Sequence, residues 1–193
     1  PAFKVSRTGL MKAYQTLPAT DSLHNQLMEP VSILKNWDYH SGENSVATTL
    51  AISWGEKILR PIYFIKVPKS DEDDQVIKTQ KFAATATAQQ LLQPLLSAMH
   101  ELENNFGTWK IKWGKINRYQ RISGEIENHF SDDSTSLPVG FTSSTWGEIP
   151  SFVSRTFNGT KKRYGYNGNS FICSVEFGKR IKAKSLLTGG ESG

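Results

Sequence analysis

The residues that most often carry chemistry are scattered along this sequence. Its four histidines, His24, His40, His100 and His129, show no paired spacing such as HExxH, so a metal site would need long-range assembly. No GxSxG nucleophile elbow is present. We therefore predict no metal ligands and no catalytic residues within the chain, and its substrate-binding residues are unknown.

Three further candidates for chemistry each have a simpler structural interpretation. Asp132-Asp133 lies in a polar stretch, where solvation of the carboxylates is expected. The glycine-rich end, Gly189 to Gly193, lacks the lysine and the strand-loop-helix context of a phosphate-binding loop. Cys173, the single cysteine, alternates with Phe171 and Val175, which predicts an inert buried strand position.

Basic residues raise the possibility of an anionic partner. The net charge is +5, and basic residues cluster at Lys161-Lys162-Arg163 and again between Lys179 and Lys184. The segment from Trp109 to Tyr119 mixes aromatic and basic side chains, as in surfaces that stack on bases and contact phosphates. Its strict alternation places tryptophans and lysines on opposite faces, which favours a core strand. We expect no nucleic-acid partner, and a stand-alone basic binding module is the alternative function.

Hydrophobic periodicity places these residues on helices first and strands later. Apolar spacings of three and four predict helices over 21–34, from Ser45 to about Pro61, after the acids 71–74, and over 91–106 with Gly107 as cap. Pro30 and Pro94 predict a kink, break or restart.

Beyond residue 107 the period changes to two. Strands are predicted over 109–113, 151–157, 170–177 and 180–187, the last three as a meander, with a turn at 167–169 and a long surface loop over 125–150. The fold class is α+β, with a mainly helical segment at 1–107 and a mainly β segment at 108–193. No apolar run reaches the roughly eighteen residues of a membrane span, and no secretion signal is present, so we expect no membrane partner.

Three stretches resemble the penicillin acylase family, which also contains acyl-homoserine-lactone acylases. They are Leu34-Lys35-Asn36-Trp37-Asp38 with Ser45 to Trp54, then Phe106-Gly107-Thr108-Trp109 with Trp113 to Arg118, then Gly168-Asn169-Ser170-Phe171 continuing to Gly189-Gly190-Glu191-Ser192-Gly193. They are similar to the family patterns "L..WD" with "S.A..L...W", "FG.W...WG...R", and "GGSF..V..F" with "GGQSG". Asn169 and Glu191 depart from the usual glycine and glutamine.

The resemblance implies an N-terminal nucleophile hydrolase of αββα architecture that cleaves the acyl group from a penicillin-like or N-acyl homoserine lactone amide. It places this chain in the C-terminal part of the large subunit, as a fragment of one larger domain. The nucleophilic serine and the oxyanion asparagine then lie upstream, and Pro1 offers no hydroxyl or thiol. The implied partners are the small subunit and the rest of the large subunit, in a periplasmic or secreted parent. The fragment alone is expected to be inactive and without a cofactor, although the parent could bind calcium.

Overall fold

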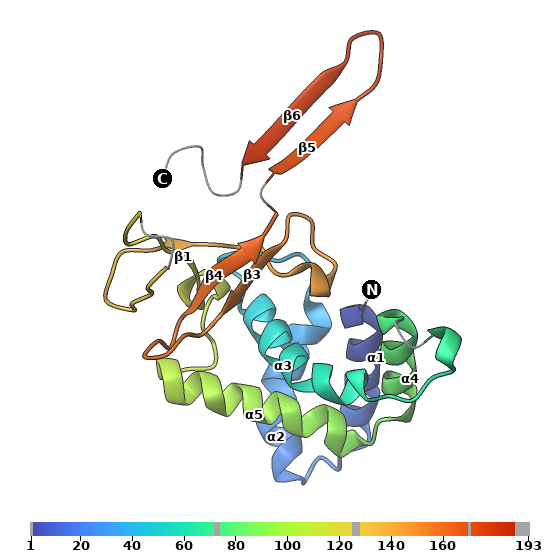
Figure 1. Cartoon of the computed structure of the whole chain (residues 1–193). Helices are drawn as coiled ribbons and strands as arrows, with labels where there is room; N and C mark the ends of the chain where they lie inside the picture. Colours follow the sequence, from blue (N-terminus) through green and yellow to red (C-terminus); the bar gives the residue numbers. More distant parts are fainter. Residues whose placement is uncertain (1, 72–73, 125–127, 170, 188–193) are drawn as a thin grey trace. The chain divides into compact units, whose positions relative to one another are not determined.

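The computed structural model describes residues 2–71, 74–124, 128–169 and 171–187. It contains two units, Pro1–Trp113 and Gly114–Gly193, which are described separately below. The first is built from helices and the second mainly from strands in two small sheets (Figure 1). The predicted α+β class is confirmed. The terminal glycine-rich loop, part of the acidic run at Glu72-Asp73 and the start of the predicted surface loop at 125–127 lie outside the described residues.

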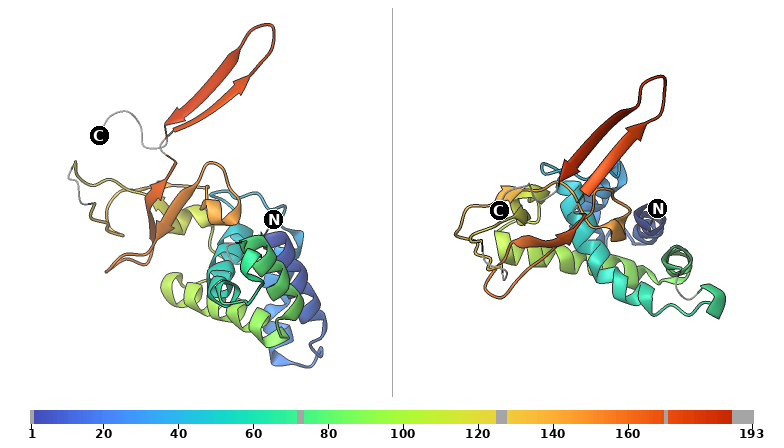
Figure 2. Two further views of the ribbon diagram at one scale, coloured as in Figure 1. Left: turned by 45° about the vertical axis from the view of Figure 1, so that its right-hand side comes forward. Right: turned by 45° about the horizontal axis from the view of Figure 1, so that its top comes forward.

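Apolar helix faces form the core of the first unit. Its helices are α1 (Ala2–Gln15), α2 (Ser22–Asn36), α3 (Val46–Tyr63), α4 (Gln75–Thr85) and α5 (Ala88–Phe106). In all views α1 (blue) lies beside α4 (green) (Figures 1 and 2). Trp54 of α3 is 1% exposed, and its indole N–H donates to the Leu91 carbonyl of α5 at 3.0 Å. The buried tryptophan thus satisfies its one donor while it packs α3 against α5.

The helix ends follow local rules that the sequence displays. Asp21, Ser45 and Asp74 accept hydrogen bonds from backbone N–H groups in the first turns of α2, α3 and α4, which have no partner within the helix. Gly107 ends α5 at φ 76°, a left-handed conformation that glycine adopts without a Cβ clash. The predicted starts near residues 21, 45 and 74 and the predicted cap at Gly107 are confirmed.

A kink or a break was predicted at two prolines, and no break forms. Pro30 lies inside α2 and Pro94 inside α5, and both helices continue without a break. A single proline removes one backbone hydrogen bond, and packing of apolar residues on both sides offsets that loss. In α2, Leu27 and Leu34 are buried on either side of Pro30.

The strand predicted over residues 109–113 does not form. An irregular connection with a bend at Trp109 follows Gly107 and leads into a short helix, α6 (Trp113–Ile116). The Trp113 N–H donates to the Ser45 carbonyl at 3.1 Å rather than to a neighbouring strand. Lys110 forms an ion pair with Glu29 at 2.6 Å. The alternation of tryptophan and lysine therefore reflects a connector whose side chains are alternately covered and exposed, and which is attached to α2 and to the start of α3.

The second unit contains a four-stranded sheet in the order β2-β1-β4-β3. Its strands are β1 (Asn117–Tyr119), β2 (Leu137–Pro138), β3 (Phe152–Arg155) and β4 (Arg163–Gly168), and only β1 and β4 pair in parallel. β4 was missed, and the turn predicted at 167–169 is wrong, because Asn167 and Gly168 belong to β4. The predicted meander is also wrong, because the last two strands form a separate sheet.

Close packing explains why a glycine-containing segment forms β4. A Cβ at Gly165 would lie 2.1 Å from the Phe152 ring, and one at Gly168 would lie 2.4 Å from the Ser151 carbonyl oxygen. Glycine in a strand often marks such an approach of a neighbouring ring or backbone.

The last two strands, β5 (Phe171–Glu176) and β6 (Lys182–Leu187), form an antiparallel hairpin. One face carries Phe171, Cys173, Val175 and Ala183, and this face is exposed: Phe171 is 57% and Val175 42% accessible. The prediction that Cys173 is buried is wrong, because its thiol is exposed. Alternation correctly predicted a strand, but burial would require a second layer on this face, and no such layer is present among the described residues.

Candidate functional site

The histidines do not assemble into a metal or acid-base site in the described part of the chain. His24 stacks on Tyr14 with ring centroids 4.7 Å apart. His40 lies at the surface, 3.3 Å from the Asp38 carboxylate. Within residues 2–71, 74–124, 128–169 and 171–187, no three His, Cys, Asp or Glu side chains gather closely enough to hold a metal ion.

Asp132 is an anchor and not the solvated carboxylate that was expected. Its carboxylate accepts hydrogen bonds from the backbone N–H groups of Lys161 at 2.7 Å and Lys162 at 3.3 Å, and it lies 2.9 Å from the Tyr164 hydroxyl. Tyr164 is fully buried, and this burial, together with the neighbouring carboxylate, raises the pKa of its hydroxyl well above the usual tyrosine range. The group therefore stays neutral and acts as a structural hydrogen-bond partner. Asp133 is exposed, as expected.

Asn117 is the centre of a buried polar cluster around β1. Its side chain has no exposed surface, and its amide nitrogen donates to the carbonyls of Val139 at 2.7 Å and Phe141 at 3.0 Å. Its amide oxygen accepts from the Ser154 hydroxyl of β3 at 2.6 Å. One asparagine therefore joins the first strand, the third strand and the segment that follows β2. A buried amide that makes three hydrogen bonds specifies structure, and it offers little to a ligand.

Two residues close to Asn117 in the sequence bind the segment 131–136, which precedes β2. The Arg118 guanidinium donates to the Gly114 carbonyl at 2.7 Å and to both the hydroxyl and the carbonyl of Ser136. The Gln120 amide donates to the Ser131 carbonyl at 2.8 Å, and its oxygen accepts from the Ser131 N–H at 2.9 Å. Sequence reasoning missed this cluster, although a run of polar residues directly after the buried Trp113 and Ile116 was a visible signal.

A second loop, residues 142–151, leads into the start of β3. The Thr142 N–H donates to the Glu148 carboxylate at 2.7 Å, and the Ser144 N–H donates to the Ser151 hydroxyl at 2.8 Å. Asn169 accepts from the Ser151 N–H through its side-chain oxygen at 2.6 Å, a contact that glycine could not make. The departure from the family pattern at Asn169 thus supplies a specific loop contact.

The basic run at 161–163 is directed largely into the protein. The Lys162 ammonium donates to the Asp132 carbonyl at 2.7 Å, and the Arg163 guanidinium donates to the Ser154 carbonyl at 2.8 Å. In the hairpin, Lys182 lies 3.9 Å from the Glu176 carboxylate. These contacts leave fewer free cations for an anionic partner than the sequence suggested.

The sequence matches the model of the penicillin amidase family over residues 6–193. The chain belongs to the penicillin amidase family. No curated protein matches the sequence. The penicillin amidase family is a family of acylase-type hydrolases.

The residues in the stretches that resemble the penicillin amidase family occupy structural positions. Trp37 follows the last residue of α2, Ser45 caps α3, and Gly107 ends α5. Asn117 and Arg118 direct their hydrogen bonds to backbone carbonyls and to serine hydroxyls. In the part of the chain that the structure describes, no helix is both long enough and apolar enough to cross a membrane.

Proposed function

We propose that this chain is the scaffold part of an amide-cleaving acylase whose nucleophile belongs to another segment of the parent protein. The observation that carries the proposal is the family match over residues 6–193. The residues of the resembling stretches support it, because the buried Asn117 and its neighbour Arg118 hold β1 and the 136–141 segment together through their hydrogen bonds.

The proposed reaction is hydrolysis of a linear amide by an N-terminal serine whose α-amino group acts as base. The substrate class is a penicillin-like or N-acyl homoserine lactone amide. The small subunit and the N-terminal part of the large subunit would complete the αββα sandwich, in a periplasmic or secreted enzyme. This chain would contribute strands and covering helices to that sandwich.

The β5–β6 hairpin supports assembly with further segments. Its face at Phe171, Cys173 and Val175 is apolar and exposed, whereas Glu176 and Lys182 lie on the opposite face. A two-stranded hairpin is marginally stable in water and gains stability when a second layer covers its apolar face. We propose that the rest of the acylase supplies this layer.

Calcium enters the proposal only through the family resemblance. The parent could bind calcium by family resemblance, but the described acidic side chains do not form a cluster of three or more.

The test compares the chain alone with the material that contains it in its native source. The purified chain is expected to leave a phenylacetyl and a long-chain acyl chromogenic amide intact. Material captured from native cells with an antibody to this chain is expected to cleave one of them and to contain a polypeptide that begins with serine, identified by N-terminal sequencing and intact mass. Turnover by the chain alone, lost on treatment with a serine-directed reagent, would refute the scaffold role.

A further inference from the structure

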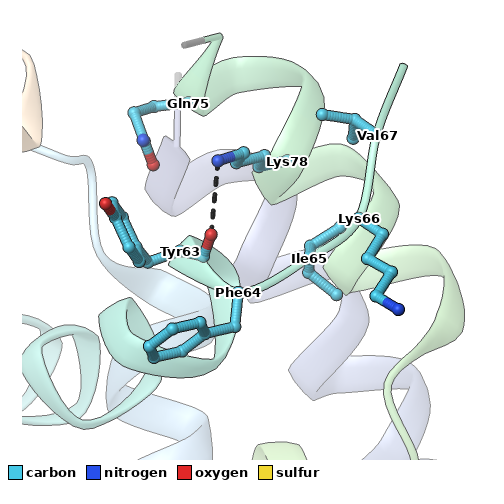
Figure 3. Close-up of a pocket in the computed structure, with 7 residues that line it drawn as sticks. All are labelled: Tyr63, Phe64, Ile65, Lys66, Val67, Gln75 and Lys78. Carbon is cyan, nitrogen blue, oxygen red and sulfur yellow. Dashed lines mark hydrogen bonds between the residues drawn. The ribbon is translucent and has the colours of Figure 1, made fainter. Parts of the chain in front are cut away.

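A hollow in the helical unit lies where the end of α3 and the residues after it meet the first turn of α4. It has a volume of about 460 Å³ and is lined by Tyr63, Phe64, Ile65, Lys66, Val67, Gln75 and Lys78. This size lies within the range of about 300–1,000 Å³ that is usual for small-molecule sites. In Figure 3 the Tyr63 ring, the Gln75 amide and the Lys78 ammonium lie around one side of the hollow, whereas the Lys66 ammonium points away.

Lys78 is the unusual member of this lining. It is only 6% exposed, whereas lysine is almost never buried without a partner of opposite charge. Its ammonium donates to the Tyr63 carbonyl at 3.2 Å and lies 5.1 Å from the centre of the Tyr63 ring. In the described part of the chain, no carboxylate forms an ion pair with it. The Tyr63 carbonyl and ring face together stabilise the buried Lys78 ammonium less than a carboxylate partner would.

We infer that this hollow binds a small organic monocarboxylate, with the carboxylate on Lys78 and the apolar body against Tyr63. The single inward cation matches one negative charge, and the Gln75 amide adds a neutral donor beside it. Tyr63 and Phe64 are 62% and 67% exposed and meet edge to face with centroids 5.3 Å apart. They offer an aromatic surface at the rim, which suits a ring or an alkyl chain.

Two features disfavour a multiply charged ligand. Phosphate sites usually combine several cations, an arginine fork or a row of backbone N–H groups. Here the second lysine of the lining, Lys66, is exposed and turned outward. The Asp74 side chain already accepts from the N–H groups of Val76 and Ile77 at the start of α4. The helix start is thus occupied by its own cap.

The test is titration of the full chain with benzoate, measured by calorimetry and by amide chemical shifts. Benzamide, which has the same shape without the charge, is expected to bind at least about 10-fold more weakly, because a charged hydrogen bond is lost. Inorganic phosphate is expected to bind no better than benzamide. Equal binding of benzoate and benzamide would overturn the proposal, as would saturable binding of phosphate in preference to benzoate.

Variants locate the site without relying on removal of the buried lysine. Gln75→Glu places a carboxylate beside Lys78 and is expected to weaken benzoate binding at least about 10-fold, through neutralisation of that lysine. Gln80→Glu is the matched control, because Gln80 is exposed on the same helix and outside the lining. Lys78→Met should abolish the binding. Loss of binding in Gln80→Glu as strong as in Gln75→Glu, or undiminished binding in a folded Lys78→Met, would refute the site.

Discussion

Replacement of Gly165 by alanine tests the packing that makes β4 a strand. The added Cβ would lie 2.1 Å from Cζ and 2.4 Å from Cε2 of Phe152. Non-bonded carbons pack at about 3.5–4.0 Å, so the ring has to move by roughly 1.4 Å or more. Over-packing of this kind costs about 1–3 kcal/mol, and because Phe152 is only half-buried and has room to turn, we expect about 2 kcal/mol.

The assay is native-state hydrogen exchange at the amides of β3 and β4. A site-specific measurement is needed because the chain contains two units, and a single denaturation curve would combine them. Gly165→Ala should lower the protection of these amides. The matched control is Gly124→Ala, because a Cβ at Gly124 meets no atom within 4 Å, and its cost should stay within about 0.5 kcal/mol.

A double-mutant cycle isolates the contact. In a Phe152→Ala background the obstructing ring is gone, so Gly165→Ala should cost little, and the coupling energy between the two positions should be about 1–2 kcal/mol. Equal costs of Gly165→Ala in the two backgrounds, or a cost no larger than that of Gly124→Ala, would refute the packing argument.

Three other measurements test the Tyr164 hydroxyl, the Arg7 guanidinium and the Cys173 thiol. The pKa of Tyr164 is raised in the folded state, so near pH 10 only the unfolded state loses this proton. The free energy of unfolding should therefore fall as the pH rises above about 10. Tyr164→Phe should flatten this slope in denaturation curves taken between about pH 9 and 11. Arg7→Met should lower stability by about 1.5–3 kcal/mol, because the guanidinium donates to three carbonyls at the end of α2, the shortest bond being 2.9 Å. The loss should appear as faster hydrogen exchange at the end of α2. Lys4→Met is the control, because Lys4 is exposed on α1, and it should change stability little. Cys173 should react fully with a maleimide in the native isolated chain and should be protected in the assembled acylase, and an unreactive thiol in the isolated chain would contradict its exposure.

Local signals predicted the helical unit well because helix ends depend on neighbouring residues. Ser45, Asp74 and Gly107 each act within one turn of their own position, so their side-chain type was enough to locate the boundary. The strand prediction over residues 109–113 was wrong because strand formation depends on a distant partner. Alternation describes an extended chain, but whether that chain becomes a strand depends on a partner, and here the Trp113 N–H finds the Ser45 carbonyl.

The strand unit was less predictable because its determinants are distant in sequence. β4 contains two glycines, and glycine is needed at position 165 because the Phe152 ring of the neighbouring strand leaves no room for a Cβ. The role of Asn117 depends on Ser154, which is 37 residues away, and on the carbonyls of the 139–141 segment. Spacing within one segment carries no information on such pairs. The same limit applies to Lys78 and Tyr63, whose common hollow no local motif announced.

The positions that carry the family resemblance also show what that resemblance can establish. Ser45 and Gly107 serve helix ends, and Asn117 and Arg118 satisfy backbone carbonyls, so substitution of any of them removes a structural contact before it affects chemistry. A motif match made of such residues reports a fold, because their contacts join backbone segments of the chain and are independent of the substrate. Catalysis has to be tested at groups that contact the substrate, and the comparison of the chain alone with the proposed assembly makes that test directly.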